Sequence, residues 1–347
     1  MWPMIKKILL SISILIILIV VFLGWTFFGP ATAFEKEKYY LYIKTGMTYD
    51  EVLNELKNDA VLKSPYFFDL LSGRTKYSSN VKAGKYEIKK GMNLIDIVRI
   101  LKNGKQVPVN LVITKLRTKE NLASAIGKHF ECDSALVMDF FDNNDTLSKY
   151  GLDSNTVMTA VFPDTYTYFW NTTPSRVFKK FFAVYQNFWT EQRKQEAKEH
   201  NLTPTTAYIL ASIIEEETNK KEDKPLIAST YLNRISKGMK LSADPTIKFA
   251  MKNFELKRIY EKYLSVESPY NTYKYAGLPP GPICTPSEQT IDAVLSSPKT
   301  NYLYFVAKAD FSGYSNFSET YEQHLKFAKE YQKALDVEME KAKQQTK

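Results

Sequence analysis

The stretch Leu210-Ala-Ser-Ile-Ile-Glu-Glu-Glu-Thr218 places three glutamates at the end of an apolar segment. Its apolar residues recur at the spacing of one helix face, which predicts a helix. Glu217 follows two isoleucines by three and four residues, so it shares their buried face. Glu215 falls on the opposite side and Glu216 at the edge of the buried face. We therefore expect only Glu217 to point clearly inward.

A carboxyl group on a buried helix face is suited to general acid catalysis. Burial disfavours the charged form and raises the pKa, so such a glutamate can carry a proton near neutral pH. A positioned group of that kind can protonate a leaving group. The alternative interpretation of Glu217 is structural: it ends the helix, turns to the surface, or pairs with Lys220 or Lys221. Helical geometry leaves both interpretations open.

The chain around this helix is expected to form a mainly helical catalytic domain over residues 201–330. Thr203 is a suitable N-cap and Pro204 suits the first helical position. Residues 267–286 are too rich in proline and glycine for regular structure, and such a long loop is usually functional. We also expect a strand over 302–307 and a lysine-rich helix from residue 319. The tail over 331–347 is expected to be frayed or disordered in its last ten residues.

Residues 106–200 are expected to connect this domain to the N-terminal part. The pattern predicts a strand over 107–113, whereas a proline in the aromatic segment 161–168 argues against a central strand there. Residues 176–199 are expected to form one long helix. Its apolar stripe, which we assign to the core, consists of Phe178, Phe181, Phe182 and Tyr185.

Residues 39–105 contain an internal repeat. Ile43-Lys-Thr-Gly-Met47 matches Ile88-Lys-Lys-Gly-Met92, and the helical pattern after each ends in Leu-Lys-Asn, at 56–58 and 101–103. Each copy is predicted to be a strand, a glycine turn and a helix. This pattern resembles the LysM fold, a module with which other envelope proteins hold glycan chains. The alternative is a packing domain that does not contact sugar.

Residues 8–28 form an apolar run without a charge, and as a helix about 21 residues cross a bilayer core of about 30 Å. Lys6 and Lys7 precede it, so residues 1–7 are expected in the cytoplasm and the rest outside. The competing interpretation is a cleaved signal peptide, because Ala31-Thr32-Ala33 resembles a cleavage site. The length of the run favours a single-pass anchor.

Composition narrows the function further. The net charge is +9, but the lysines are interspersed with glutamates, so we expect no nucleic-acid partner. The three histidines are isolated and lack metal-ligand spacing, so no metal site is expected. Cys132 and Cys284 could form one disulfide in an oxidising compartment. No motif implies a cofactor.

Several short segments, taken in order, resemble the endolytic murein transglycosylases of the MltG, or YceG-like, family. The segments are Phe162-Pro-Asp-Thr-Tyr166, residues 211–218, Asn233-Arg234, Gly238-Met239, Asp244-Pro-Thr246, Tyr270-Asn-Thr-Tyr273 and Gly277-Leu-Pro-Pro-Gly-Pro-Ile283. The resemblance covers nearly the whole chain, from the apolar run onward. In that family a hydroxyl residue follows the catalytic glutamate, which Glu217-Thr218 matches. The chain departs from the family at Glu216, where lysine is common.

The resemblance implies an α+β protein with a transmembrane helix, a LysM-like subdomain and a mainly helical lysozyme-like domain. It implies cleavage between N-acetylmuramic acid and N-acetylglucosamine in nascent strands without water, leaving a 1,6-anhydro end and limiting strand elongation. Glu217 would protonate the leaving oxygen and then accept a proton from the C6 hydroxyl. Glu215 matches a second family glutamate and is a secondary acidic candidate. The expected substrate contacts are Asn233, Arg234, Asp244, Thr246, Tyr270, Asn271 and Tyr273.

Two other functions remain open. One is a murein hydrolase that uses water, with Asp244 as second carboxylate unless it is an N-cap before Pro245. The other is a non-catalytic glycan-binding scaffold, which would not need Glu217. Arg234 equally suits a buried ion pair, and the loop at 277–282 equally suits a purely conformational role. The partners expected from the resemblance are peptidoglycan, the cell-wall synthases and the elongation or division machinery, at the outer side of the cytoplasmic membrane.

Overall fold

The computed structural model describes residues 2–256 and 258–345 of the chain. Met1 of the predicted cytoplasmic segment and the last two residues of the predicted tail lie outside the described residues. The chain forms two compact units. The N-terminal unit runs to Leu111 and includes Gly127–Cys132 and Thr167–Thr173, and the C-terminal unit contains the remainder. Residues 106–200, expected as one connecting region, are thus divided between both units.

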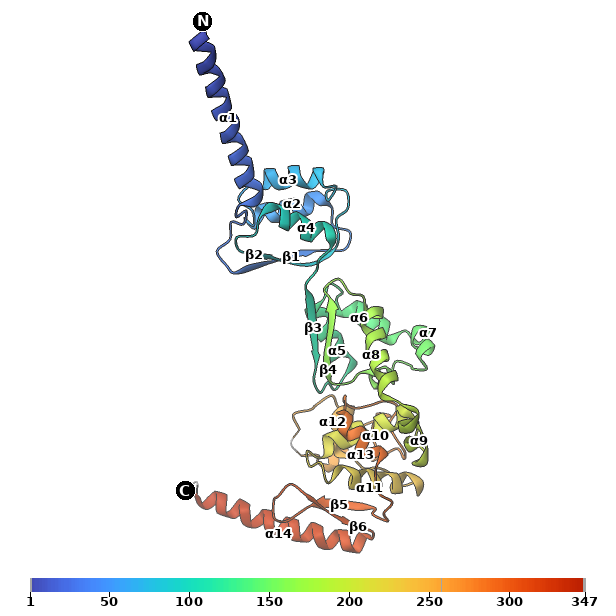
Figure 1. Ribbon diagram of the computed structural model, residues 1–347. Coiled ribbons are helices and arrows are strands. Elements are labelled where there is room, and N and C mark those ends of the chain that lie inside the picture. The colour runs from blue at the N-terminus through green and yellow to red at the C-terminus, as the bar shows by residue number, and fades with distance from the viewer. Residues whose placement is uncertain (1, 257, 346–347) are drawn as a thin grey trace. The chain divides into compact units, whose positions relative to one another are not determined.

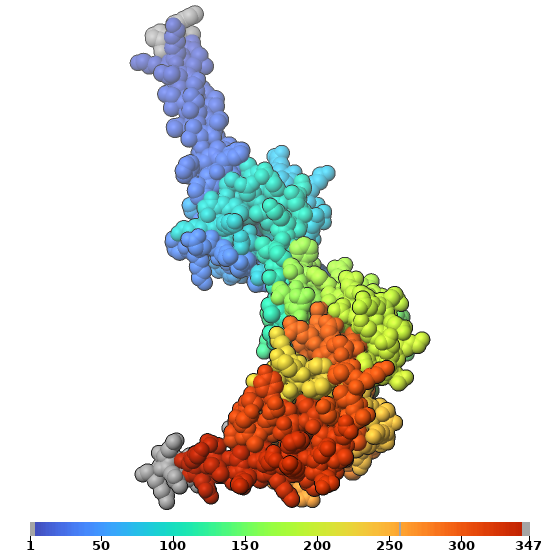
Figure 2. All heavy atoms as spheres, turned by 60° about the horizontal axis from the view of Figure 1, so that its bottom comes forward, coloured from blue at the N-terminus to red at the C-terminus, as the bar shows by residue number. Residues whose placement is uncertain are grey.

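Helix α1 (Trp2–Phe28) contains the apolar run predicted to span a membrane. The helix over Met4–Phe28 is long and apolar enough to cross a bilayer, a property that a signal sequence shares. The helix extends away from the rest of the N-terminal unit along most of its length (Figures 1 and 2), and its apolar window is not buried.

The segment after α1 is part of the folded unit. Ala31 and Thr32 are buried, and Thr32 forms a β-bridge with Leu62. Backbone hydrogen bonds join Ala31 N to Met92 O at 3.0 Å and Lys63 N to Ala31 O at 2.8 Å. Cleavage after Ala33 would remove these buried contacts, so the packing favours retention of α1.

The predicted internal repeat is present in the N-terminal unit (Figure 1). A strand, a glycine turn and a helix occur twice, and a further helix that the sequence analysis did not predict, α3, lies between the copies. The elements are β1 (Lys38–Ile43), α2 (Tyr49–Asn58), α3 (Pro65–Arg74), β2 (Gly84–Lys89) and α4 (Leu94–Asn103).

The two copies use the same turn and cap chemistry. Gly46 and Gly91 have φ values of 85° and 79°, which residues with a Cβ rarely adopt. Thr48 caps α2 and Asn93 caps α4, each through a side-chain oxygen that accepts a backbone N–H. The repeat in sequence therefore reflects a repeat in backbone conformation.

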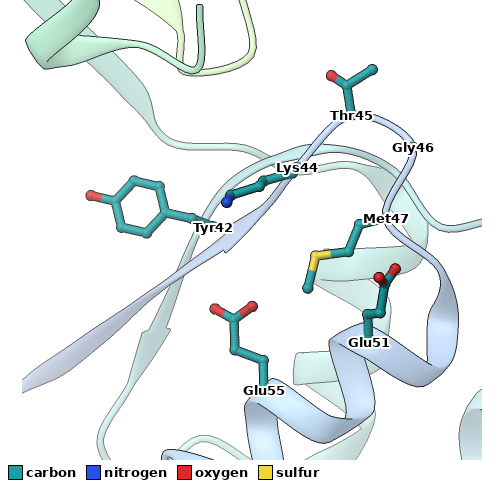
Figure 3. A pocket seen from close by; sticks show the side chains of 7 residues that line it. All are labelled: Tyr42, Lys44, Thr45, Gly46, Met47, Glu51 and Glu55. Carbon is teal, nitrogen blue, oxygen red and sulfur yellow. The ribbon is translucent and has the colours of Figure 1, made fainter. Parts of the chain in front are cut away.

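Strands β1 and β2 pair antiparallel, from Lys38 opposite Lys89 to Ile43 opposite Gly84. The apolar faces of the sheet and helices form one core, whose fully buried residues include Leu41, Val52, Leu56, Ile88, Ile97 and Leu101. A cavity of about 410 Å³ opens beside the first turn (Figure 3). It is lined by Tyr42, Lys44, Thr45, Gly46, Met47, Glu51 and Glu55.

Strand β3 (Pro108–Ile113) pairs with β4 (Asp164–Phe169) in a second two-stranded sheet, which confirms the strand predicted over 107–113. Pro163 directly precedes β4. Each strand of a two-stranded sheet is an edge, so the expectation that this segment is not a central strand is confirmed. Between β3 and β4 lie α5 (Lys119–His129), α6 (Ser134–Asp142), α7 (Asn144–Leu147) and two 3-10 turns, Ser148–Tyr150 and Val157–Ala160.

The prediction of one long helix over 176–199 is wrong. The chain forms α8 (Pro174–Phe188) and α9 (Glu191–Glu199) instead. Thr190 is extended and its hydroxyl accepts from Arg193 N, so it caps the second helix, while Trp189 turns into the core. Of the predicted stripe, Phe178 and Phe181 are fully buried, whereas Phe182 and Tyr185 are partly exposed.

Helix α10 (Pro204–Glu217) is central to the C-terminal unit. It begins as predicted, with Thr203 in a capping box and Pro204 in the first turn. Helices α9, α11, α12 and α13 all contact it. The remaining elements are α11 (Lys224–Ser236), α12 (Asp244–Ala250), a 3-10 turn at Glu261–Tyr263, α13 (Glu288–Leu295), β5 (Tyr304–Ala307), β6 (Ser315–Ser318) and α14 (Tyr321–Gln345).

The surroundings of α10 correct the expectation that this helix has a single buried face. All residues from Ala207 to Ile214 are buried. Glu215, Glu216 and Glu217 are each partly buried, so Glu217 is not the only one that points inward. Apolar periodicity cannot identify one inner face when neighbours surround a helix.

The expectation of a frayed C-terminal tail is corrected, and the question of a disulfide, which the sequence left open, is answered. Helix α14 continues through Gln345, so the frayed tail is absent from the described residues. Its Ala, Glu, Lys and Gln residues are strong helix formers, and Lys341 pairs with Glu338 at 2.8 Å. Cys132 and Cys284 are both buried and are not joined by a disulfide.

Candidate active site

Glu217 is the last residue of α10, and its carboxyl group faces α11. The hydroxyl of Tyr231, in α11, donates to Glu217 Oε1 at 2.6 Å. Tyr231 is buried, so packing fixes the direction of its hydroxyl. Glu217 does end the helix, as the structural interpretation supposed, but it turns to Tyr231 rather than to the surface. Lys220 instead lies over the ring of Tyr314.

Burial raises the pKa of Glu217 from 4.5 to about 7. The hydrogen bond from Tyr231 lowers this pKa, the negative charge of Asp244 raises it, and the positive charges of Arg234 and Lys248 lower it. Burial outweighs the opposing effects. A pKa near neutral pH suits Glu217 both to donate a proton and to accept one.

A second carboxylate, Asp244, acts on Glu217 from the start of α12. Asp244 is exposed, and its Oδ1 accepts a hydrogen bond from the hydroxyl of Tyr273 at 2.5 Å. The N-cap of α12 is Ala243, so the alternative interpretation of Asp244 as N-cap is wrong. The site thus combines a partly buried carboxyl group of raised pKa with an exposed carboxylate.

Glu215 lies in a network of donors on α11 and near α13. Its Oε2 accepts from Lys224 Nζ at 2.8 Å, from Ser287 Oγ at 3.1 Å, and from Thr290. Burial alone would raise the pKa of Glu215, but the Lys224 charge and the hydrogen bonds together hold it below its usual value. An ionised carboxylate with three donors suits an ion-pair partner better than a proton donor.

Glu216 is also neutralised, by two cations from the segment after β3. Lys115 Nζ lies 2.9 Å from Glu216 Oε1, and Arg117 Nη2 lies 3.1 Å from Oε2. Burial raises the pKa of Glu216, but the two cations lower it by more, so the pKa lies below its usual value. Glu216 therefore adds no uncompensated charge beside Glu217.

Asn233 and Arg234, expected as substrate contacts, bind backbone carbonyls. The Asn233 amide donates to Thr300 O at 2.8 Å and to Tyr302 O at 3.0 Å. The Arg234 guanidinium donates to Leu303 O at 2.6 Å and to Leu241 O at 2.5 Å. These bonds join α11 to the chain before β5 and to the chain before α12, and the Arg234 charge is close enough to affect Glu217.

Asn271 is fully buried and organises the loop that carries Tyr273. Its amide donates to Leu264 O at 2.9 Å and to Val266 O at 2.8 Å, while its Oδ1 accepts from Tyr273 N at 2.9 Å. This side chain positions Tyr273, whose hydroxyl contacts Asp244.

Thr246 and Tyr270, also expected to bind substrate, have different environments. Thr246 is fully buried, and its hydroxyl shares a hydrogen bond with Thr272 at 2.8 Å, which joins α12 to the loop. Tyr270 packs against Phe249 with ring centroids 4.6 Å apart and lines a cavity of about 180 Å³. Tyr270 is thus the one of the two that borders open space.

Two residues of this site, Tyr231 and Lys248, carry no signal in the sequence that marks them as functional. Tyr231 lies on the apolar side of its helix, where tyrosine usually belongs to the core, and its pairing with Glu217 arises only in the folded unit. Lys248 lies in a short helix with no distinctive motif. Across residues 2–256 and 258–345, no group of three or more His, Cys, Asp or Glu side chains is placed to hold a metal ion.

A tyrosine-bonded carboxyl group of raised pKa, beside a second carboxylate in a mainly helical unit, is the arrangement of an acid–base catalyst. Comparison with known families agrees with the sequence resemblance. The chain belongs to the YceG-like family, whose sequence model matches residues 41–330.

The chain is similar to curated members of known name. It is 29% identical over 323 residues to the endolytic murein transglycosylase of Bacillus subtilis, covering 89% of each chain. It is 28% identical over 308 residues to the endolytic murein transglycosylase of Streptococcus pneumoniae, covering 80% of this chain and 56% of that relative. The chain is also similar to the crystal structure of a YceG-like protein from Listeria monocytogenes, with a TM-score of 0.55 and 29% sequence identity. The match covers 84% of this chain and 99% of the Listeria chain.

Proposed function

We propose that this protein is an endolytic murein transglycosylase that cuts nascent glycan strands between N-acetylmuramic acid and N-acetylglucosamine. The observation that carries the proposal is the setting of Glu217, the residue that the sequence resemblance assigns as catalytic: its carboxyl group accepts from buried Tyr231 at 2.6 Å, and burial raises its pKa to about 7. The Bacillus and Streptococcus relatives bear this enzyme name, and the family match covers residues 41–330.

In the proposed reaction one carboxyl group serves twice. Protonated Glu217 gives its proton to the glycosidic oxygen as the bond from that oxygen to C1 of the muramic acid breaks. The C6 hydroxyl oxygen of the same sugar then bonds to C1, and its proton passes to the Glu217 carboxylate. The products are a 1,6-anhydro end and a free hydroxyl on the departing sugar, and Glu217 is protonated again. The substrate supplies the nucleophile, so no second catalytic carboxylate is required.

We assign different roles to the neighbouring residues. Tyr231 holds the Glu217 carboxyl group at 2.6 Å, which fixes the direction of proton transfer. Tyr273 and Asp244 border the bound sugar on its exposed side, and Tyr270 lies along the glycan strand. Asn233, Arg234, Thr246 and Asn271 act by holding α11, α12 and the loop in position, because their polar atoms bind the protein itself.

We further propose that the C-terminal unit is lysozyme-like in its use of a helix-borne glutamate, and that the N-terminal unit is LysM-like and holds the glycan. The cavity beside the first repeat turn supports this second role, because it combines an aromatic ring with charged and hydroxyl groups (Figure 3). Sugar rings pack on aromatic faces and hydrogen-bond to such polar groups.

Helix α1 is proposed to anchor the protein in the cytoplasmic membrane, with both units on the outer side. Its apolar length and the buried segment at Ala31 and Thr32 support an uncleaved anchor. Such an anchor keeps the site near strands that are still being synthesised and so limits their elongation. The proposed partners are therefore the cell-wall synthases and the elongation or division machinery.

The test is mass spectrometry of the glycan ends that the full-length protein, in detergent, releases from uncrosslinked strands. We expect 1,6-anhydro ends from the unmodified protein. Glu217→Gln should lower their release by at least about 100-fold, the usual range for loss of a general acid. The matched control is Glu199→Gln, since Glu199 also ends a helix, α9, but is exposed. It should behave like the unmodified protein.

Two other results would replace the proposal. Reducing ends from the unmodified protein would identify a hydrolase and direct attention to Asp244, whose exposed carboxylate could activate water. Normal release by Glu217→Gln would remove Glu217 from the catalytic role. A protein that binds strands without cutting them would be a scaffold.

A further inference from the structure

The N-terminal unit contains a second cavity, of about 250 Å³, at the end of α1. Its walls are mainly apolar, and among the described residues that line it Lys63 is the one charged side chain. The residues that matter here are Phe22, Trp25, Phe67, Leu94 and Lys63. An apolar cavity with a single cation at its edge suits a ligand with a hydrocarbon part and an anionic part.

The position of this cavity along α1 relates it to the bilayer. This step rests on the proposed anchoring of α1. The helix ends at Phe28, and Phe22 lies about 9 Å deeper along its axis at 1.5 Å per residue. If Phe28 marks the outer edge of the hydrocarbon core, Phe22 faces acyl chains. Lys63, which lies beyond the helix end, is then at the level of the lipid headgroups.

Contacts inside the unit hold the cavity in this place. Lys63 N donates to Ala31 O at 2.8 Å, which ties Lys63 to the chain just after α1. The ring of Phe67, in α3, lies 6.2 Å from that of Phe22 and 5.8 Å from that of Phe27. The cavity is therefore bounded by α1 and by the start of α3.

Large apolar and aromatic side chains are exposed around the cavity. Trp25, Phe28 and Tyr66 are each more than 70% exposed, and Leu70 is 44% exposed. Figure 1 shows α3 along the end of the unit from which α1 emerges. Aromatic side chains concentrate where a membrane protein crosses from hydrocarbon to water. Exposed apolar groups at this end are thus expected to face lipid.

We propose that this cavity binds an anionic phospholipid of the outer leaflet. One acyl chain lies against Phe22, Phe67 and Leu94, and the headgroup phosphate lies at Lys63. A zwitterionic lipid is less suited, because no acidic side chain lines the described cavity to receive its cationic group. Bound lipid would hold α3 on the membrane surface and so fix the N-terminal unit close to the bilayer.

The test is native mass spectrometry of the full-length protein released from nanodiscs of equal parts phosphatidylglycerol and phosphatidylcholine. We expect retained phosphatidylglycerol to exceed retained phosphatidylcholine. Lys63→Gln should lower that ratio about fivefold, the factor for one lysine at an anionic lipid surface. Phe22→Ala, on α1, should lower the retention of both lipids. The matched control is Lys102→Gln, an exposed lysine at the end of α4, which should leave the ratio unchanged.

Equal retention of the two lipids by the unmodified protein would overturn the proposal, as would an unchanged ratio in Lys63→Gln. Preferential retention of a polyprenyl pyrophosphate, added at the same fraction, would assign the cavity to a carrier lipid instead. Glu217→Gln should retain phosphatidylglycerol normally. A failure of lipid binding is therefore distinct from a failure of the proposed cleavage activity, which is measured in detergent.

Discussion

At the scale of single residues, the site depends on differences among three adjacent glutamates. Glu215 is paired with Lys224, and Glu216 with Lys115 and Arg117, so both have lowered pKa values. Glu217 has a neutral tyrosine as its hydrogen-bond donor, and burial raises its pKa to about 7. Similar burial is accompanied by pKa shifts in opposite directions, because cations are paired with only two of the three carboxylates.

The pH dependence of cleavage should follow the groups around Glu217. Activity should fall as pH rises through about 7, because the proton donor is lost. Tyr231→Phe removes a hydrogen bond that lowers the Glu217 pKa, so this fall should move to higher pH. Asp244→Asn removes a negative charge that raises the pKa, so the fall should move to lower pH. Initial cleavage rates of both variants, measured against pH, would check this. If the pH profiles of the two variants moved in the same direction, the loss of activity would be due to the titration of a group other than Glu217.

The same residue should make stability depend on pH. The Glu217 pKa is raised in the folded state, so folding takes up a proton between pH 4.5 and about 7. Stability should therefore fall across that window as pH rises, by at most about 3 kcal/mol. When it is measured above pH 7, the melting temperature of the C-terminal unit should be clearly higher in Glu217→Gln than in the unmodified protein. Near pH 4.5 the two melting temperatures should differ little. Thermal unfolding at both pH values would test this, with Glu199→Gln as control; an equal change at both would contradict it.

At the scale of elements, the loop after Glu261–Tyr263 shows how packing restricts a sequence. A Cβ at Gly281 would lie 2.1 Å from Asn155 O and 2.8 Å from the Tyr270 hydroxyl. Glycine is therefore required by close approach of the chain to the Asn155 backbone. The conformational role considered for the segment at 277–282 has this steric basis.

Gly281→Ala should displace this loop from Tyr270. We expect the C-terminal unit to lose about 1–3 kcal/mol of stability through overpacking, and cleavage activity to fall with it. Urea unfolding and the glycan-release assay would measure both effects. The control is Gly73→Ala in α3, where a Cβ would meet nothing within 4 Å. That change should leave activity intact and stabilise α3 slightly. A Gly281→Ala protein as stable as the unmodified protein would refute the steric explanation.

At the scale of the whole molecule, the anchor and the N-terminal unit share a folded segment. Ala31 and Thr32 are 6% and 5% exposed, and they bind the second repeat turn and the chain before α3. A protein processed after Ala33 would lack this part of its core. The packing of Ala31 and Thr32 thus gives the unit a structural reason to retain the chain that follows α1, in addition to the proposed membrane attachment.

Protein isolated from cell membranes should therefore have the intact mass of a chain that still contains α1. Intact-mass spectrometry of the membrane and soluble fractions would measure this directly. Replacing the exposed Ala33 by leucine, which removes the small-residue pattern of a cleavage site, should leave the mass pattern unchanged apart from the substitution. A mature chain that begins at Phe34 would contradict the prediction and identify a secreted form.

Much of the fold could be predicted from local patterns. The apolar run, the strand-turn-helix repeat, the Thr203 cap and the strand at 107–113 all depend on residues within a few positions of one another. The errors occurred where tertiary packing decides. Trp189 enters the core and ends α8, and α10 is surrounded by other helices, which local periodicity cannot reveal.

Motif order and apolar period are properties of the chain, so the family, the catalytic candidate Glu217 and the repeat of the N-terminal unit could all be recognised before folding is considered. The groups that meet Glu217 could not, because they depend on the fold. Tyr231, Asp244 and Lys248 come from two other helices, and the pKa of about 7 arises from burial that no local pattern encodes. The physical reason is that desolvation and charge interactions depend on distance in space, and folding sets that distance independently of separation along the chain.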